Sequence, residues 1–542
     1  MGFFKRHFVP AFLSAVLTLC FSPLVPTARA VYSDAENTWA AGVIEKAAAY
    51  GLMEGYPDGR FGVGENMTRA QFVTVLCRMF SWEVSDSPTP LHPDCEGHWA
   101  LPYIDAAARH GVEDNGGVFR PDDYISRMEM ARMLVQGLGY DRLARSLEDA
   151  SLPFPDVAED KGYAAIAYDL GVITGMEENG AIKFLPTFSA TREQCAATLV
   201  RCYERYSSQT QWLHGFYAFS SYPQLSYAGE MDAVSLGWAR LEADESGVPL
   251  VNSSAENGND WARPEQSDLV TGYLSERSIP YNLNIFGSAS TFASITVANT
   301  QTEAISQLVA AARPYAGLTM DVEGLRSDHR EAYSAFMAAL RAALPADKTL
   351  YVCVQPDTWY GGFDYRALGE ACDKVILMAH DYQWSSIPDY YLGTDRTYCP
   401  VTPIDQIYTA LRHITDPDTG VQDRTKLALA ISFNTTGFHV DENGLLLDQT
   451  FYHPATSTIA QRLEQEDSTR VWDDQSRNPN LYYTADGEHY RLWYEDAQSV
   501  AEKLRLARMF QITGVSVWRL GMIPDYPGIE NYDVWSVLSQ RS

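Results

Sequence analysis

The sequence predicts a multidomain protein in which a helical repeat array precedes an α/β barrel of eight β/α units. Three observations indicate this: a length of 542 residues, a polar motif that recurs three times before residue 207, and alternating strand-like and helix-like segments after residue 211. The net charge of −29 argues against nucleic acid and anionic membrane surfaces as partners. It is compatible with neutral or sugar substrates.

Residues 1–30 have the features of a secretory signal peptide. Lys5 and Arg6 form a basic region, residues 8–25 are apolar, and Ala28-Arg29-Ala30 matches the cleavage pattern. We therefore expect a secreted mature chain that begins near residue 31. No second apolar run approaches the length of a membrane span, so none is expected in the mature protein.

Seven cysteines remain after this cleavage. Cys195 and Cys202 fall on one predicted helix, about 10 Å apart along its axis, which is too far for a disulfide. We expect buried thiols rather than a disulfide framework. No spacing indicates a zinc site, and we expect neither a metal nor a cofactor.

A threefold repeat occupies residues 31–207, with copies at 31–91, 92–151 and 152–207. Its landmark is a polar motif before an amphipathic helix: Thr68-Arg69-Ala70-Gln71, Ser126-Arg127-Met128-Glu129 and Thr191-Arg192-Glu193-Gln194. Ser or Thr with Gln or Glu three residues later is a capping box, which satisfies free amides at a helix start. Capping alone would fit a plain helical array, but it does not explain an Arg beside each cap. A guanidinium beside a helix N-terminus suits a carboxylate or another anion.

With these motifs the three copies resemble S-layer homology domains, whose motif is typically Thr-Arg-Ala-Glu. The resemblance implies a bacterial cell-surface location and binding of secondary cell-wall polysaccharide through Arg69, Arg127 and Arg192. Trp39 and Trp99, on the earlier helix of the first two copies, are further polysaccharide-binding candidates. The third copy has Tyr163 at about that place.

Residues 212–542 predict a (β/α)8 (TIM) barrel. The expected strands are 214–219, 233–238, 281–286, 317–323, 349–355, 374–381, 427–433 and 514–518. Residues 434–491 are too long for a loop, and we expect a small α+β insertion there, between the seventh and eighth strands. The junction 206–211 is short and lacks proline, which predicts a barrel close to the repeats.

The fourth expected strand carries the most informative residues. Thr319, Asp321 and Glu323 are spaced two apart, so they project from one face of a strand. In a parallel barrel that face is the interior, and catalysis takes place at its C-terminal mouth. Two carboxyls this close raise one pKa by mutual repulsion, which keeps an acid protonated near neutral pH.

The segment 315–325 resembles the fourth-strand signature of glycoside hydrolase family 18, Asp-Gly-x-Asp/Asn-x-Asp-x-Glu. Further resemblances lie, in the expected order, at 376–384, 400–404, 492–496 and 514–521. They imply substrate-assisted, retaining catalysis, in which the substrate's 2-acetamido oxygen attacks the anomeric carbon. Glu323 would be the general acid/base, and Asp321 would hold the acetamide and stabilise the oxazolinium intermediate.

The same resemblance places Asp381 in the active site and Trp518 as the apolar floor under the sugar. His380 stands where the family has a tyrosine that positions the acetamide, and Tyr217 lines the pocket or packs in the core. Ala316 and Thr319 also depart from the signature.

The leading hypothesis is a wall-anchored hydrolase of β-1,4 bonds next to N-acetylglucosamine, with peptidoglycan favoured over chitin. The alternative is a carbohydrate-binding surface-layer protein whose barrel is weakly active or inactive. A purely structural surface-layer subunit would leave Asp321, Glu323 and Trp518 unexplained.

Overall fold

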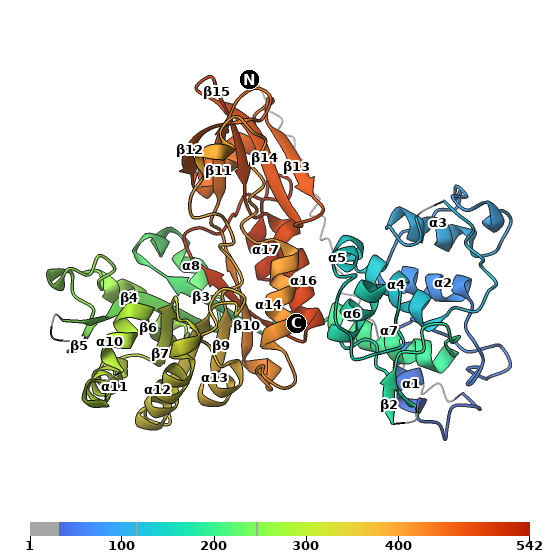
Figure 1. Ribbon diagram of the computed structural model, residues 1–542, viewed down its shortest axis with the longest axis horizontal. Coiled ribbons are helices and arrows are strands. Elements are labelled where there is room, and N and C mark those ends of the chain that lie inside the picture. Colours follow the sequence, from blue (N-terminus) through green and yellow to red (C-terminus); the bar gives the residue numbers. More distant parts are fainter. Residues whose placement is uncertain are drawn as a thin grey trace, which may run out of the picture.

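The computed structural model describes residues 32–114, 116–178, 180–244, 246, 248–296 and 298–541. The predicted signal peptide therefore lies outside the described residues. Three parts are visible in Figure 1: the repeat array, the barrel, and a small sheet that stands above the barrel. Within the described ranges, no helix is both long and apolar enough to cross a membrane.

The repeat array consists of helices arranged around a closed ring of strand-like contacts. Its helices are α1 (Ala41–Ala49), α2 (Arg69–Met79), α3 (Leu101–Arg109), α4 (Arg127–Gly137), α5 (Asp141–Ser146), α6 (Lys161–Asp169) and α7 (Arg192–Tyr206), with a short hairpin of β1 (Met176–Glu178) and β2 (Ala181–Lys183). The predicted capping boxes start α2 and α4: Thr68 and Ser126 accept from the backbone N–H groups of Gln71 and Glu129, both at 3.2 Å. Bridges 66–191, 68–124 and 126–189 join each repeat to the other two.

The barrel confirms the predicted fold class. Eight parallel strands close on themselves in the order β3, β4, β6, β7, β8, β9, β10 and β16, and β5 extends β4 as an antiparallel edge. The strands are β3 (Trp212–Tyr217), β4 (Ala233–Ala243), β5 (Pro249–Asn252), β6 (Tyr281–Ser288), β7 (Gly317–Glu323), β8 (Thr349–Val354), β9 (Lys374–Leu377), β10 (Leu427–Ser432) and β16 (Gly514–Trp518).

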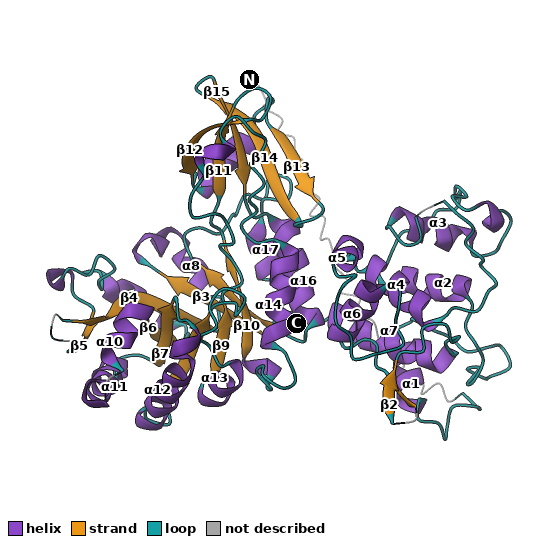
Figure 2. Cartoon of the chain, in the orientation of Figure 1, coloured by secondary structure: helices purple, strands orange, loops and turns teal. Residues whose placement is uncertain are grey.

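Helices cover the outside of the barrel, as the purple ribbons of Figure 2 show. They are α8 (Leu225–Ala228), α9 (Ser267–Glu276), α10 (Ala289–Ile295), α11 (Ala298–Ala312), α12 (Arg330–Ala343), α13 (Tyr365–Ala371), α14 (Ile404–Ile414), α16 (Ala497–Met509) and α17 (Val534–Leu538). Their apolar faces pack on strands whose residues are buried on both sides, as a parallel sheet requires.

Four strands (β3, β8, β9 and β10) end earlier than predicted, and β9 differs most. The expectation of 374–381 was wrong at its end, because β9 stops at Leu377. Asp381 has a φ of 61°, which lies in the left-handed region and cannot continue a strand. This turn places His380 and Asp381 on the loop at the barrel mouth.

A five-stranded antiparallel sheet lies in the chain between β10 and α16. Its strands are β11 (Thr436–Val440), β12 (Leu446–Tyr452), β13 (Thr469–Asp473), β14 (Asn478–Ala485) and β15 (Glu488–Trp493), with α15 (Thr456–Leu463) between β12 and β13. A separate apolar cluster that includes Ile459, Leu481 and Tyr494 supports it. The sheet therefore has its own small core above the barrel mouth (Figure 1).

All seven cysteines of residues 32–541 are buried free thiols. Cys195 and Cys202 lie on the apolar face of α7, as the helix spacing predicted. Burial raises the pKa of both to about 12, so they are protonated and unreactive.

Candidate active site

Three side chains of β7 point into the barrel at increasing height. Thr319 is fully buried, Asp321 is 3% exposed, and Glu323 is only partly buried at the mouth. Strand alternation puts them on the inner face, and register with β6 pairs Thr319 with Asn284 and Asp321 with Phe286. Glu323 is thus the carboxyl nearest to an entering ligand.

The pKa of Asp321 lies far above the usual range of an aspartate. Burial, and next the charge of Glu323, raise the pKa of Asp321 to about 7, against the opposing effects of Asn284 and His380. Its Oδ1 has no hydrogen-bond partner in the described part of the chain. This oxygen is therefore a buried acceptor whose hydrogen-bonding capacity is unsatisfied.

Burial also raises the pKa of Glu323, the charge of Asp381 adds to the rise, and His380 opposes it. A glutamic acid with a raised pKa keeps its proton closer to neutral pH, which a general acid requires.

His380 and Asp381 form a pair beside Glu323. The Asp381 carboxylate lies 2.9 Å from His380 Nδ1 and accepts hydrogen bonds from Asn434 (2.8 Å) and Ser432 (3.2 Å). Burial would raise the pKa of Asp381, but His380 and these donors lower it overall. Burial would lower the pKa of His380, but Asp381 and Glu323 raise it overall. Asp381 is thus ionised, and it orients the imidazole.

A cavity of about 190 Å³ opens in front of the two carboxyls of β7. Its lining includes Phe216, Tyr217, Arg240, Trp261, Asn284, Phe286, Asp321, Glu323 and Trp518. The Trp518 ring contacts Phe216 with centroids 5.2 Å apart, and burial raises the pKa of Tyr217 to about 12. The lining unites four of the candidate residues, whereas His380 and Asp381 lie outside it, next to Glu323.

Below this cavity, a chain of hydrogen bonds crosses the barrel interior. His214 contacts Ser516 and Ser235 at 2.8 Å each, and Ser235 contacts Thr319 at 2.6 Å. Burial lowers the pKa of His214 to about 3, so its imidazole is neutral. The Thr319 hydroxyl thus contacts Ser235 and also accepts from Asn282 Nδ2 at 3.4 Å.

Several residues at the site were absent from the sequence prediction. Asn284 and Arg240 come from neighbouring strands, Trp261 from the segment after β5, and Asn434 from just after β10. Asn282 and Asn284, two apart on an expected strand, were a usable signal because polar residues on an inner strand face are unusual. Trp261 had no such signal.

The candidate polysaccharide-binding residues of the repeats fall into two groups. Arg69, Arg127 and Arg192 are 1%, 7% and 6% exposed, whereas Trp39 and Trp99 are 68% and 58% exposed. Each arginine Nε donates to a backbone carbonyl of another repeat, on Phe119, Phe184 and Phe61 respectively.

Tyr163 does not occupy the place that the sequence comparison gave it. Its ring is buried, and its hydroxyl donates to Asp141 at 2.6 Å. Counted back from Gly51, Gly111 and Gly171, the position of Trp39 and Trp99 corresponds to Glu159. The prediction erred because the segment before the third repeat's helix differs in length.

A parallel barrel with two carboxyls of raised pKa and aromatic side chains at its mouth has the architecture of a glycosidase. Within the described ranges, no group of three His, Cys, Asp or Glu side chains could hold a metal ion. Residues 281–522 match the family model for glycosyl hydrolases family 18, and residues 31–73 and 93–131 match that for the S-layer homology domain. The chain carries a family 18 glycosyl hydrolase domain preceded by S-layer homology domains.

Two curated relatives each match part of the chain. Cell surface glycoprotein 1 of Acetivibrio thermocellus is 36% identical over 141 residues, which cover 24% of this chain and 6% of that protein. The cortical fragment-lytic enzyme of Bacillus subtilis is 25% identical over 240 residues, which cover 40% of this chain and 50% of that protein. The chain thus spans a small part of the first relative and about half the length of the second.

Two solved structures are similar to part of the chain. The Bacillus cereus spore cortex-lytic enzyme SleL has a TM-score of 0.48 and 16% identity, covering 70% of this chain and 82% of that chain. A chitinase from Chromobacterium violaceum has a TM-score of 0.46 and 22% identity, covering 61% of this chain and 98% of that chain.

Proposed function

We propose that the protein is a secreted, wall-anchored glycosidase that cleaves β-1,4 bonds next to N-acetylglucosamine with retention of configuration. The observation that carries this proposal is the position of Glu323, which has a raised pKa and lines the cavity beside Asp321. Trp518 supplies an apolar face in the same cavity, where a sugar ring can stack.

In the proposed reaction, Glu323 gives its proton to the glycosidic oxygen as the bond to the anomeric carbon breaks. The acetamido oxygen of the same sugar attacks that carbon, and Asp321 accepts a hydrogen bond from the acetamido N–H. Glu323, now ionised, then takes a proton from the water that opens the oxazolinium ion. His380, which contacts Asp381 through Nδ1, would donate to the acetamide through Nε2.

Peptidoglycan is the favoured substrate over chitin. The S-layer homology domains support a location at a bacterial cell surface, where they would bind secondary cell-wall polysaccharide. The Bacillus subtilis relative is named a cortical fragment-lytic enzyme. Both points support a substrate from the wall itself.

The test compares the unaltered protein with Glu323→Gln on peptidoglycan and on chitin oligomers, with release of reducing ends as the readout. Loss of the acid is expected to lower kcat by about 10²–10⁴-fold. Glu331→Gln, an exposed glutamate on α12, is the matched control and should leave the rate unchanged. Proton NMR of the first product should show the β-anomer.

A barrel that binds glycans without cleaving them is the second candidate. It is favoured by Thr319, whose hydroxyl contacts Ser235 and so leaves Asp321 Oδ1 unpartnered. Binding of chitin oligomers by the unaltered protein, without release of reducing ends from either polymer, would establish it and refute the enzymatic proposal.

A further inference from the structure

A pocket at the junction of the repeat array and the barrel is lined by arginines. It has a volume of about 410 Å³, and its lining includes Arg201, Glu204, Arg205, Arg424, Arg508 and Thr513. These residues come from α7, from the segments just before β10 and β16, and from α16. α7 and α16 pack against each other (Figure 1). The space, which we call the junction pocket, is therefore at the amino ends of the strands, opposite the catalytic mouth.

The acidic residue of this lining is engaged elsewhere. Glu204 pairs with Lys46 at 2.7 Å and accepts from the Tyr50 hydroxyl at 2.9 Å. Among the residues that the structure describes, no carboxylate forms an ion pair with any of the four pocket arginines. The chain as a whole has a net charge of −29, so this local excess of positive charge runs against its composition.

Backbone carbonyls account for three of the four pocket arginines. Arg201 and Arg205 donate to carbonyls just after the end of α6, where the helix dipole is negative, and Arg205 also donates to the last carbonyl of α16. Arg424 donates to two carbonyls between α14 and β10. A structural role is sufficient to explain these three side chains.

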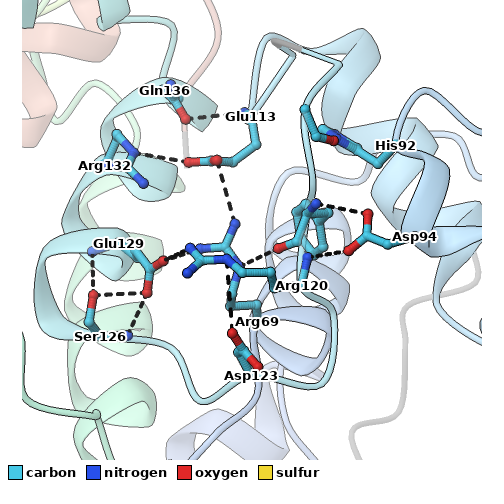
Figure 3. A network of polar contacts seen from close by, with 12 residues as sticks. Arg69, His92, Asp94, Glu113, Arg120, Asp123, Ser126, Glu129, Arg132 and Gln136 are labelled. Carbon is cyan, nitrogen blue, oxygen red and sulfur yellow. Dashed lines mark hydrogen bonds and ion pairs between the residues drawn. The ribbon is translucent and has the colours of Figure 1, made fainter.

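Arg508 has neither kind of partner. Its guanidinium makes no hydrogen bond in the described part of the chain, and its Nε is buried. Buried arginines of the repeat array are satisfied by the chain itself: Arg69 pairs with Glu129 at 2.6 Å (Figure 3), and Arg127 donates to two backbone carbonyls. Because an unpaired buried donor costs free energy, Arg508 indicates an acceptor that the chain does not supply.

The charges of the pocket arginines also oppose one another. Burial lowers the pKa of each below the ordinary value of an arginine. The Arg201 and Arg424 charges lower the pKa of Arg205 further, and the Arg505 charge does the same for Arg508. All of them remain protonated, because a guanidinium keeps its proton at every physiological pH. An anion in the junction pocket would offset this repulsion.

A phosphate group fits this set of donors better than a carboxylate. It carries about two negative charges near neutral pH, and its oxygens face several directions, so it can accept from guanidinium forks on both sides of a pocket. Ser208, Thr425 and Thr513 add hydroxyl donors to the lining. We propose that the junction pocket binds a phosphate group, held by guanidinium groups of the repeat array and of the barrel.

Calorimetric titration of the mature full-length protein with inorganic phosphate, at constant ionic strength, tests the proposal. Acetate is the carboxylate probe and should not bind. Arg508→Gln is expected to weaken phosphate binding about tenfold or more, as loss of a charge-assisted contact does. Arg508→Lys keeps the charge but not the fork and should weaken binding less. Arg313→Gln makes the same change of charge at an exposed position after α11 and should have no effect.

Thermal unfolding separates a ligand contact from a structural one. Phosphate should raise the unfolding temperature of the unaltered protein, and Arg508→Gln should lose most of this rise. Without phosphate, Arg508→Gln should unfold at no lower a temperature than the unaltered protein, because it removes an unpaired charge. A lower temperature would show that Arg508 stabilises the fold itself and would overturn its role as a phosphate contact.

A phosphodiester probe identifies the source of the phosphate group. Tighter binding of glycerophosphoglycerol than of inorganic phosphate assigns a phosphodiester, and the reverse order assigns the free ion. The proposal is wrong if phosphate does not bind, if acetate binds as tightly, or if Arg508→Gln binds phosphate unchanged. Because the junction pocket is opposite the catalytic mouth, Arg508→Gln should match the unaltered protein in hydrolysis of chitin oligomers, which keeps this test separate from that of the proposed function.

Discussion

At the scale of single residues, the two carboxyls of β7 differ in what surrounds them. Asp321 is buried with one oxygen unpartnered, whereas Glu323 reaches the mouth beside His380 and Asp381. The environment thus assigns them different roles, although both are acidic residues on one face of one strand. Different surroundings give two carboxyls different pKa values, so that one can act as an acid while the other positions the substrate.

The raised pKa of Asp321 has a consequence for stability. In the folded protein its pKa is about 7, compared with an ordinary value of 3.8. Between these two pH values the folded state binds a proton that the unfolded state has released. The contribution of this proton to the free energy of unfolding is lost as the pH rises from 3.8 toward 7.

We expect the free energy of unfolding of the barrel to fall between pH 3.8 and about 7 in the unaltered protein, and to fall less over the same range in Asp321→Asn. Urea denaturation at pH values through this range measures it. Asp328→Asn, at an exposed position after β7, is the control and should keep the full fall. Identical pH dependence in the unaltered protein and Asp321→Asn would contradict the prediction.

At the scale of elements, a buried ion pair connects α16 to the five-stranded sheet. Glu495 and Lys503 are each 1% exposed and lie 2.6 Å apart. Glu495 also accepts from Asn478 of β14 at 2.7 Å and from Ser499 of α16 at 2.6 Å. Burial lowers the pKa of Lys503 despite the neighbouring Glu495 charge.

Removing one partner of this pair should destabilise more than removing both. Glu495→Gln leaves a buried ammonium without its counter-charge and is expected to cost about 3–5 kcal/mol of unfolding free energy. The double variant Glu495→Gln with Lys503→Met should recover much of that loss. Denaturant titration provides the measurement, with exposed Glu466→Gln as the control. A double variant less stable than the single one would contradict this account.

At the scale of the whole molecule, the repeat array contacts the barrel directly (Figure 1). Asp169, at the end of α6, accepts from Tyr408 (2.5 Å) and pairs with Arg412 (3.1 Å), both on α14. The Arg505 guanidinium of α16 lies 5.4 Å from the Tyr206 ring centroid. The short junction predicted this closeness, and the contacts fix the barrel relative to the repeat array.

The combined change Asp169→Ala and Arg505→Ala should loosen this contact. We expect the radius of gyration to rise in small-angle X-ray scattering, because the junction alone then restrains the two parts. Hydrolysis of soluble chitin oligomers should not change, since neither residue is near the cavity. Asp418→Ala, on an exposed loop, is the control. Unchanged scattering of the double variant would show that the junction alone sets the arrangement.

Local sequence patterns by themselves determined much of this molecule. The capping boxes located α2, α4 and α7, and the apolar runs located all eight barrel strands, with β7 and β16 predicted to the residue. These features depend on neighbours a few positions away, so a single sequence contains the necessary information. The end of β9 was missed because the left-handed turn at Asp381 depends on its bonds to Ser432 and Asn434, more than 50 positions away.

Only the tertiary structure decided what the charged residues face. The backbone carbonyls that accept from the motif arginines belong to other repeats and lie 50, 57 and 131 positions away along the chain. Likewise, Asn284 reaches Asp321 through the register of a neighbouring strand. Burial and long-range pairing set the pKa of a carboxyl and determine which groups contact an arginine. Both depend on residues that are distant in the sequence.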